Sequence, residues 1–471
     1  MQYVSTRGEA PPLGFLDVTL AGLARDGGLY VPEAWPRFSP QAIASFVGKP
    51  YAEVALEVIK PFVGGTISDA NLSRMVHEAY GTFRHPVVAP LVQLDVSNFL
   101  LELFHGPTLA FKDIAMQLLA RLMDHALAAR GERATIVVAT SGDTGGAAVE
   151  AFRGRDRADL FVLYPAGRIS DVQRLMMTTA SDPNVHTLAI EGTFDDCQDL
   201  VKAMFNHHAF REQVRLSGVN SINFARIVAQ AVYYFTSAAT LGAPQRKIAF
   251  TVPTGNFGDV FAGFVAERMG LPIDRLVVAT NVNDILVRAM TTGSYEVRSV
   301  IATSSPSMDI QVSSNFERLL FEAYARDGKA VRNLMGSLTQ SRRFSISTRA
   351  LSEIRSLFTA DRADEEETAA TMRTVLNETG RFVDPHTAVG IAVAEKEVRD
   401  PSVPMIVLST AHAAKFPEAV EAACGVGAPR PDSIADLFDR EERITPMPVD
   451  QARVENFILA ASRAAQKGAA A

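Results

Sequence analysis

One lysine, Lys112, stands where a reactive side chain would be expected. It ends the segment Phe-His-Gly-Pro-Thr-Leu-Ala-Phe-Lys, residues 104–112, which follows an apolar run from residue 99. The run predicts a strand, the Gly-Pro pair a turn, and the residues after Lys112 a helix that Thr108 could cap. A lysine that a cleft removes from water loses its proton and attacks carbonyl carbons. Lys112 is therefore our first candidate for a catalytic residue, although most lysines are solvated.

Two glycine-rich loops have the composition of anion-binding sites. One is Thr-Gly-Asn-Phe-Gly-Asp, residues 254–259, and the other is Ser-Gly-Asp-Thr-Gly-Gly, residues 141–146. Both stand between an expected strand and an expected helix, where backbone N–H groups and the positive helix end can hold a phosphate. The alternative is a tight turn with a capping side chain, Asp259 in the first loop and Ser141 or Thr144 in the second. A carboxylate at Asp259 would repel a phosphate unless it points away or accepts a hydrogen bond from a hydroxyl or backbone donor.

A third polar segment, Asn-Ser-Ile-Asn-Phe-Ala-Arg at residues 220–226, gathers amide, hydroxyl and guanidinium groups. Arginine is the side chain best shaped to hold a phosphate or carboxylate with two hydrogen bonds. The alternative is a helix start that Ser221 or Asn223 caps, with Arg226 exposed. The composition of this segment leaves both interpretations open.

Two further segments follow expected structural elements near the C-terminus. Ser-Thr-Ala-His, residues 409–412, comes after the last apolar run and could set a hydroxyl against the ring of a ligand. Asp-Pro-His, residues 384–386, pairs a carboxylate with an imidazole that could act as an acid or base. Neither His386 nor His412 has a local metal-binding partner, so we expect no metal site.

The elements that must position these side chains repeat one pattern from about residue 99 onward. An apolar, β-branched run is followed by a polar loop and then by a stretch of helical periodicity; such runs occur at residues 134–140, 160–164, 185–190, 247–252 and 404–409. Continuous apolar strands that alternate with helices indicate parallel sheets covered on both faces, and hence the α/β class. Ligands of such sheets bind outside the carboxyl ends of the strands, where these loops lie.

The chain divides by composition into three parts. Residues 1–95 contain several prolines and two helix-like stretches, and we expect them to form an N-terminal accessory region. Residues 96–430 are expected to form the catalytic body, with a smaller lobe inserted at about residues 130–235, and residues 431–471 a C-terminal extension. Within the body, residues 346–378 are charged and expected to be helical, and Ser314 with Glu317 fits a capping box.

Bulk composition excludes several classes of function. The 471 residues carry 46 lysines and arginines against 53 aspartates and glutamates, so the net charge of −7 does not favour binding to nucleic acid or to a membrane surface. There are two cysteines and neither a dinucleotide-binding fingerprint nor a P-loop motif. The first residues lack the apolar core of a signal peptide and no long apolar run follows, which predicts a cytoplasmic protein.

These motifs together resemble the threonine synthases of the longer type, in order and from near residue 3 to about residue 420. The similarity rests on Tyr-Val-Ser-Thr-Arg-Gly at residues 3–8, Asp-Gly-Gly-Leu-Tyr-Val-Pro at 26–32, the lysine segment, the three polar segments, Ser-Met-Asp-Ile at 307–310, Asp-Pro-His-Thr at 384–387 and Leu-Ser-Thr-Ala-His at 408–412. The resemblance implies the tryptophan-synthase-β-like fold of type II pyridoxal-phosphate enzymes, with two parallel-sheet α/β lobes and the cofactor between them.

The resemblance also implies roles for individual residues. Lys112 would bind the aldehyde of pyridoxal 5'-phosphate, and Thr410 would hydrogen-bond the nitrogen of the pyridine ring. Ser141, Asp143 and Thr144 would meet the carboxylate of the substrate. The phosphate of the cofactor would lie on Gly255, Asn256, Phe257, Gly258 and Asp259, while Asn223 and Arg226 would help to hold the phosphate of the substrate.

The reaction implied is the last step of threonine biosynthesis, in which O-phospho-L-homoserine and water give L-threonine and phosphate. The protein would act as a monomer or homodimer on this small molecule. Serine or threonine dehydratases and cysteine synthases share the fold and the lysine, so they remain alternatives, as does a ligand-binding relative without activity. The basic group at Arg226 separates them, because a phosphorylated substrate needs it and serine does not.

Overall fold

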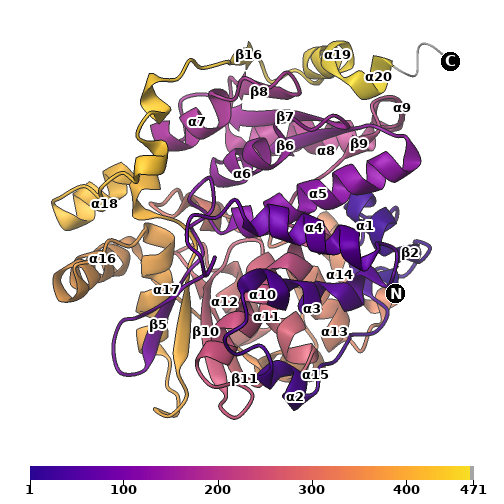
Figure 1. Cartoon of the computed structure of the whole chain (residues 1–471). Coiled ribbons are helices and arrows are strands. Elements are labelled where there is room, and N and C mark those ends of the chain that lie inside the picture. The colour runs from indigo at the N-terminus through magenta and orange to yellow at the C-terminus, as the bar shows by residue number, and fades with distance from the viewer. Residues whose placement is uncertain (467–471) are drawn as a thin grey trace.

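The computed structural model describes residues 1–466, in which two mostly parallel sheets form two lobes (Figure 1). The larger sheet has the order β14 (Phe358–Arg362), β11 (Ile273–Thr280), β10 (Ile248–Pro253), β15 (Met405–Ser409), β5 (Asn98–Glu102) and β4 (Leu91–Gln93). Its neighbouring strands are parallel except for the antiparallel pair β4 and β5. The α/β class predicted from the sequence is confirmed.

The smaller sheet, at the top of Figure 1, is parallel throughout. Its order is β16 (Thr445–Met447), β8 (Val185–Ile190), β7 (Ala158–Pro165), β6 (Ala134–Ala139) and β9 (Leu216–Ser217). All eight residues of β7 and all six of β10 are buried. Strands covered on both faces explain why the sequence runs are continuously apolar rather than alternating.

Helices follow the strands in both lobes. The smaller lobe carries α6 (Asp143–Phe152), α7 (Asp171–Thr178), α8 (Phe194–Asn206) and α9 (His208–Gln213). The remaining helices of the body are α5 (Lys112–Arg130), α10 (Phe224–Thr240), α11 (Gly258–Arg268), α12 (Ile285–Thr292), α13 (Phe316–Ala323), α14 (Gly328–Ser341), α15 (Thr348–Arg355), α16 (Glu365–Thr379), α17 (Pro385–Lys396) and α18 (Pro417–Cys424). The strands β12 (Ser294–Glu296) and β13 (Arg343–Ser345) form an antiparallel ribbon, in which β12 follows α12 and β13 follows α14.

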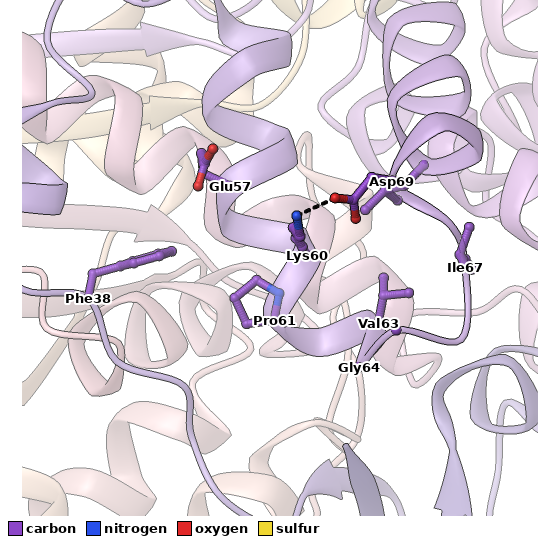
Figure 2. A pocket seen from close by; sticks show the side chains of 10 residues that line it. Phe38, Glu57, Lys60, Pro61, Val63, Gly64, Ile67 and Asp69 are labelled. Carbon is purple, nitrogen blue, oxygen red and sulfur yellow. Dashed lines mark hydrogen bonds and ion pairs between the residues drawn. The ribbon is translucent and has the colours of Figure 1, made fainter.

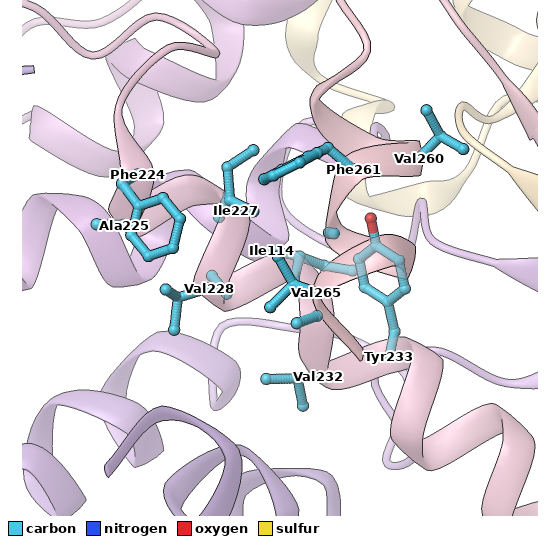
Figure 3. Packing of buried hydrophobic residues seen from close by; sticks show 14 of the residues in the cluster. Ile114, Phe224, Ala225, Ile227, Val228, Val232, Tyr233, Val260, Phe261 and Val265 are labelled. Atoms are coloured by element: carbon cyan, nitrogen blue, oxygen red, sulfur yellow. The ribbon is translucent and has the colours of Figure 1, made fainter. Parts of the chain in front are cut away.

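The main core lies where α5, α10 and α11 pack together. Figure 3 shows Ile114 of α5 among Phe224, Ile227 and Tyr233 of α10 and Phe261 of α11. Helix α10 is buried along nearly its whole length because α3 (Tyr51–Val63), α5 and α11 all contact it. The starts of α5, α10 and α11 are therefore fixed relative to one another, and each of them carries a residue of the candidate site.

The N-terminal region packs on this core. It contains the small sheet β2 (Leu13–Gly14), β1 (Gln2–Ser5) and β3 (Tyr30–Pro32), and the helices α1 (Phe15–Ala21), α2 (Pro40–Ala44), α3 and α4 (Asp69–Tyr80).

The expected capping box of Ser314 and Glu317 is wrong, because α13 has no side-chain cap. Glu317 instead accepts hydrogen bonds from Thr6 at 2.6 Å and Arg7 at 3.0 Å, which tie the start of the chain to the body.

The sequence pattern did not predict two strands in the C-terminal part of the chain, β14 and β16. Residues 346–378 are not helical throughout, because β14 lies between α15 and α16 and pairs with β11 at the edge of the larger sheet. In the C-terminal extension β16 pairs with β8, and α19 (Gln451–Ala461) and α20 (Arg463–Gln466) lie along the smaller lobe (Figure 1). Residues 467–471 of the extension lie outside the described residues. None of the described helices has the length and apolar character needed to span a membrane.

Candidate active site

Lys112 is the first residue of α5, and the turn before it is held by buried hydrogen bonds. The side chain of Asp113 accepts from the N–H of Thr108 at 2.7 Å and from its hydroxyl at 2.6 Å, and burial raises the pKa of Asp113 to about 6. Thr108 therefore does not cap the helix as expected, because its hydroxyl donates to Asp113. The N–H of Phe111 donates to the carbonyl of Thr410 at 2.8 Å, which joins this turn to the end of β15.

The amine of Lys112 lies in a buried charge cluster. The residue is only 8% exposed, and Nζ lies 3.2 Å from Oδ2 of Asp143 at the start of α6. Oδ1 of Asp143 lies 2.7 Å from Nζ of Lys415 and accepts from the amide of Gln173 at 3.0 Å. Burial lowers the pKa of Lys112, while the charge of Asp143 opposes that shift and the charges of Lys415 and Arg226 add to it. Such an amine is suited to act as a nucleophile and a base.

Asp143 itself is ionised. Burial alone would raise the pKa of its carboxyl, but the positive charges of Lys415 and Lys112 outweigh burial and hold the pKa well below its usual range. This carboxylate is the only group of the cluster that joins the two amines. Its negative charge favours the protonated form of Lys112, against the effect of burial on the pKa of that amine.

The loop before α11 presents an anion cradle of backbone donors. Within residues 1–466, nothing accepts a hydrogen bond from the N–H groups of residues 255–260, and α11 has no side-chain cap. Phe257 adopts a left-handed φ of 63°, and the loop carbonyls are held by Ser313, which donates to Gly255 at 2.7 Å, and by Asn315, which donates to Asn256 at 2.9 Å. Consecutive free N–H groups at a helix start fit a phosphate.

Asp259 does not disturb this cradle. Its Oδ1 accepts hydrogen bonds from the hydroxyl of Tyr233 and, at 3.3 Å, from that of Tyr234. Burial raises the pKa of Asp259 to about 7, with Tyr233 opposing the shift. A carboxyl that engages hydroxyl donors and is only partly ionised at neutral pH is compatible with a nearby phosphate. It does not cap α11, so the capping alternative for this loop is wrong.

The loop before α6 has free backbone donors as well. The hydroxyl of Thr140 accepts from the N–H groups of Gly142 and Gly145, each at 2.9 Å. No acceptor among residues 1–466 meets the N–H groups of Ser141, Asp143 and Thr144, and neither Ser141 nor Thr144 caps the helix with its side chain. This loop, next to the amine of Lys112, can therefore bind a carboxylate through its main chain.

Asn223 and Arg226 lie in different situations. Asn223 caps α10 by accepting from the N–H of Ala225 at 3.1 Å, and its amide donates to the carbonyl of Thr19 at 2.8 Å, so both ends of its side chain are engaged. Arg226 is only 3% exposed, which contradicts the expectation of an exposed side chain that accompanied the capping interpretation. It donates to the carbonyl of Val219 at 3.2 Å, while its Nε is buried without an acceptor among the described residues.

The environment of Arg226 is that of an anion-binding group. Burial lowers its pKa to about 10, and it is close enough to Lys112 and Asp259 to affect the pKa of each. A buried guanidinium with an unused donor is costly unless an anion meets it. Unlike Asn223, Arg226 therefore keeps a buried donor that a ligand could engage.

Thr410 and His386 complete the set of sequence candidates. Thr410 is 5% exposed, and nothing in residues 1–466 hydrogen-bonds its hydroxyl. His386 has both ring nitrogens engaged, one with Asp384 at 2.8 Å and the other with the N–H of Ser307 at 3.2 Å. The imidazole therefore joins the segment of Asp384 to that of Ser307. No group of three or more side chains that could bind a metal is present in residues 1–466.

Sequence reasoning missed Lys415 and Gln173. Both reach Asp143 from segments far from it in sequence. The one signal that could have indicated Lys415 is the position of a lysine within the mostly apolar stretch after residue 412. A surface hollow of about 400 Å³ in the N-terminal region, lined by residues of α3 and the loop before α4, is not part of the site (Figure 2). It holds the exposed ion pair of Lys60 and Asp69 and contains none of the candidate residues.

Comparisons with known proteins agree with this geometry. Residues 2–80 match the family model for the N terminus of threonine synthase, residues 84–410 that for pyridoxal-phosphate-dependent enzymes, and residues 387–458 that for the C-terminal part of threonine synthase. The chain belongs to the threonine synthase family. It is accordingly a pyridoxal-phosphate-dependent lyase, as the resemblance predicted, and the backbone cradle at residues 255–260 fits the phosphate of that cofactor.

Threonine synthases of known sequence and structure match the whole chain. A threonine synthase from Pseudomonas aeruginosa is 54% identical over 460 residues, which are 97% of this chain and 98% of that protein. The crystal structure of a threonine synthase from Brucella melitensis with pyridoxal phosphate bound is 60% identical, covers 98% of this chain and 100% of its own, and has a TM-score of 0.96. The yeast threonine synthase structure has a TM-score of 0.92 at 38% identity, with 98% of each chain covered. These relatives confirm the predicted fold family and threonine synthase function.

Proposed function

We propose that this chain converts O-phospho-L-homoserine and water into L-threonine and phosphate at the site around Lys112. One observation carries the choice of substrate. Three separate sets of anion donors surround the lysine, namely the N–H groups of residues 255–260, those of Ser141, Asp143 and Thr144, and the guanidinium of Arg226. The cofactor brings one phosphate and this substrate brings a carboxylate and a phosphate, which makes three anionic groups. Serine or threonine would leave one donor set unused.

The cofactor would be held by Lys112 at its aldehyde, by residues 255–259 at its phosphate and by Thr410 at its ring nitrogen. When bound, pyridoxal phosphate withdraws electrons from the carbon atoms of the substrate through its ring. Thr410 offers the ring nitrogen a neutral hydroxyl, which does not hold a proton there as a carboxylate would. The substrate carboxylate would lie on the main chain of residues 141–144, because the side chain of Asp143 is committed to Lys112 and Lys415.

Lys112 serves as both base and acid in this proposal. Once the amine of the substrate has displaced Lys112, the freed amine of Lys112 removes and returns protons at Cα, Cβ and Cγ of the substrate. Burial favours the neutral amine that this task needs. Arg226 would hold the phosphate that leaves, and Asn223 would keep the start of α10, and with it Arg226, in position. A water molecule then supplies the hydroxyl group at Cβ.

The test is turnover with matched substrates. Wild-type protein with pyridoxal phosphate should release L-threonine and phosphate in equal amounts from O-phospho-L-homoserine, and Lys112→Ala should release neither. L-Serine and L-threonine serve as comparison substrates, since a dehydratase would give a 2-oxo acid from them. A 2-oxo acid without threonine would overturn the proposal. The cytoplasmic location and the monomeric or dimeric state stay predictions from the sequence.

A further inference from the structure

A second buried lysine, Lys415, shares the carboxylate of Asp143 with Lys112. It ends the short 3-10 helix η2 (Ala413–Lys415) and is only 1% exposed. Its Nζ lies 2.7 Å from Oδ1 of Asp143 and donates to the carbonyl of Thr108 at 2.8 Å. The carbonyl of Lys415 in turn accepts from the hydroxyl of Ser170 at 3.1 Å. Lys415 is therefore fixed at both its side chain and its main chain.

The two lysines compete unequally for the one carboxylate. Lys415 has two oxygen acceptors within 2.8 Å, whereas Lys112 has one, at 3.2 Å. With both amines protonated the three groups carry a net charge of +1 in a buried site, and such an unbalanced charge is costly. Since the contacts of Lys415 are more numerous and shorter, the cluster is relieved most easily when Lys112 gives up its proton.

We propose that Lys415 is a positioning residue that occupies the charge of Asp143 and thereby leaves Lys112 as the free amine. The proposal rests on the role of Lys112 in the proposed function. Without Lys415, Lys112 would be the one amine of the described residues left in contact with Asp143, which would stabilise the protonated form of Lys112. The pair of Lys415 and Asp143 also spares the carboxylate of the substrate from an unbalanced negative charge beside its binding loop.

Other charged groups act on the same amine from neighbouring helices. Arg226 of α10 repels a proton on Lys112, while Asp259 of α11 lies within electrostatic range of both. The charge of His386 on α17 helps to lower the pKa of Asp143. None of these three groups has a hydrogen bond or ion pair with the Lys112 amine within the described part of the chain, whereas Asp143 does. The contacts of Asp143 should therefore dominate the response to substitution.

The test measures the pH at which Lys112 becomes reactive. Full-length protein freed of cofactor is mixed with pyridoxal phosphate at a series of pH values and reduced with borohydride, and the initial rate of labelling at Lys112 is followed by peptide mass spectrometry. In Lys415→Met the midpoint pH of this rate should rise by about one unit or more. In Asp143→Asn it should fall by a similar amount. The double variant Lys415→Met/Asp143→Asn should return to the wild-type value or below it.

Each outcome decides the proposal. An unchanged midpoint in Lys415→Met, or a double variant that keeps the raised midpoint, would overturn it. If Lys415→Met does not fold, as judged by thermal unfolding, Lys415→Gln takes its place, and a midpoint that fails to rise in that variant would overturn the proposal. Wild-type protein that is labelled elsewhere than at Lys112 would instead contradict the proposed function.

Discussion

Gly255 lies directly against the main chain of Ser307. A Cβ atom on Gly255 would come closer than 3.0 Å to the carbonyl oxygen of Ser307, a separation that real Cβ atoms essentially never show. The loop that carries the backbone donors of residues 255–260 therefore lies in close contact with the segment that contains Ser307. The N–H of Ser307 in turn donates a hydrogen bond to the ring of His386. The position of the anion cradle depends on the absence of a side chain at residue 255.

Gly255→Ala should weaken the binding of pyridoxal phosphate about tenfold or more, because the loop must move away from Ser307 to relieve the overlap. Equilibrium titration of cofactor-free protein measures this change. Gly336→Ala on α14 is the matched control, since no atom of the described residues outside the adjoining helix backbone lies within 4 Å of its Cβ position. Alanine there should leave cofactor binding unchanged and stabilise the helix by about 1 kcal/mol. Wild-type affinity in Gly255→Ala would show that the loop does not hold the cofactor.

Arg226→Gln should raise the KM for O-phospho-L-homoserine about tenfold or more. The reason is the loss of a buried, charged donor whose Nε has no acceptor among the described residues. Inhibition by inorganic phosphate should weaken by a similar factor, and cofactor absorbance reports whether the fold is retained. Arg349→Gln, at an exposed position of α15, is the control and should leave both constants unchanged. A KM that does not change would remove Arg226 from the substrate site.

Asp259 should make the stability of the cofactor-free protein depend on pH. Burial raises its pKa to about 7 in the folded protein, against about 4 in an unfolded chain. The folded state thus binds this proton more tightly, so the stabilisation is fully present below about pH 4 and is lost as the pH rises through about 7.

Asp259→Asn removes this dependence while it keeps an acceptor for Tyr233. From pH 5 to pH 8 the melting temperature of the variant should therefore gain roughly 2 to 4 °C relative to wild type. Thermal unfolding of both proteins at the two pH values measures the difference. A constant difference would mean that Asp259 is already ionised at pH 5.

The parts of the site that the sequence predicted are those that local chain geometry creates. Lys112 and the loops at residues 141–146 and 254–259 each follow a strand and open a helix, and the carboxyl ends of parallel strands bring such loops together. Arg226 was predicted as a ligand-binding group from its chemistry, although its burial could not be read from the segment itself.

Contacts between distant segments could not be predicted. Lys415 reaches Asp143 across more than 270 positions of the chain, and Glu317 turns from its own helix start to Thr6 and Arg7. The strands β14 and β16 lie at sheet edges and are only partly buried, so their sequences lack the continuous apolar pattern that identifies the central strands. Threonine is a residue type that often caps helices, but the hydroxyl of Thr108 donates instead to the buried carboxylate of Asp113. This hydrogen bond is charge-assisted and therefore stronger than one between neutral groups.

We predict that Lys112, and not the neighbouring Lys415, carries the cofactor. Reduction of the purified protein with borohydride in the presence of pyridoxal phosphate, followed by peptide mapping, identifies the modified residue directly. We expect one modification per chain, at Lys112, because Lys415 is held by Asp143 and Thr108. Modification at Lys415 with an unmodified Lys112 would contradict it.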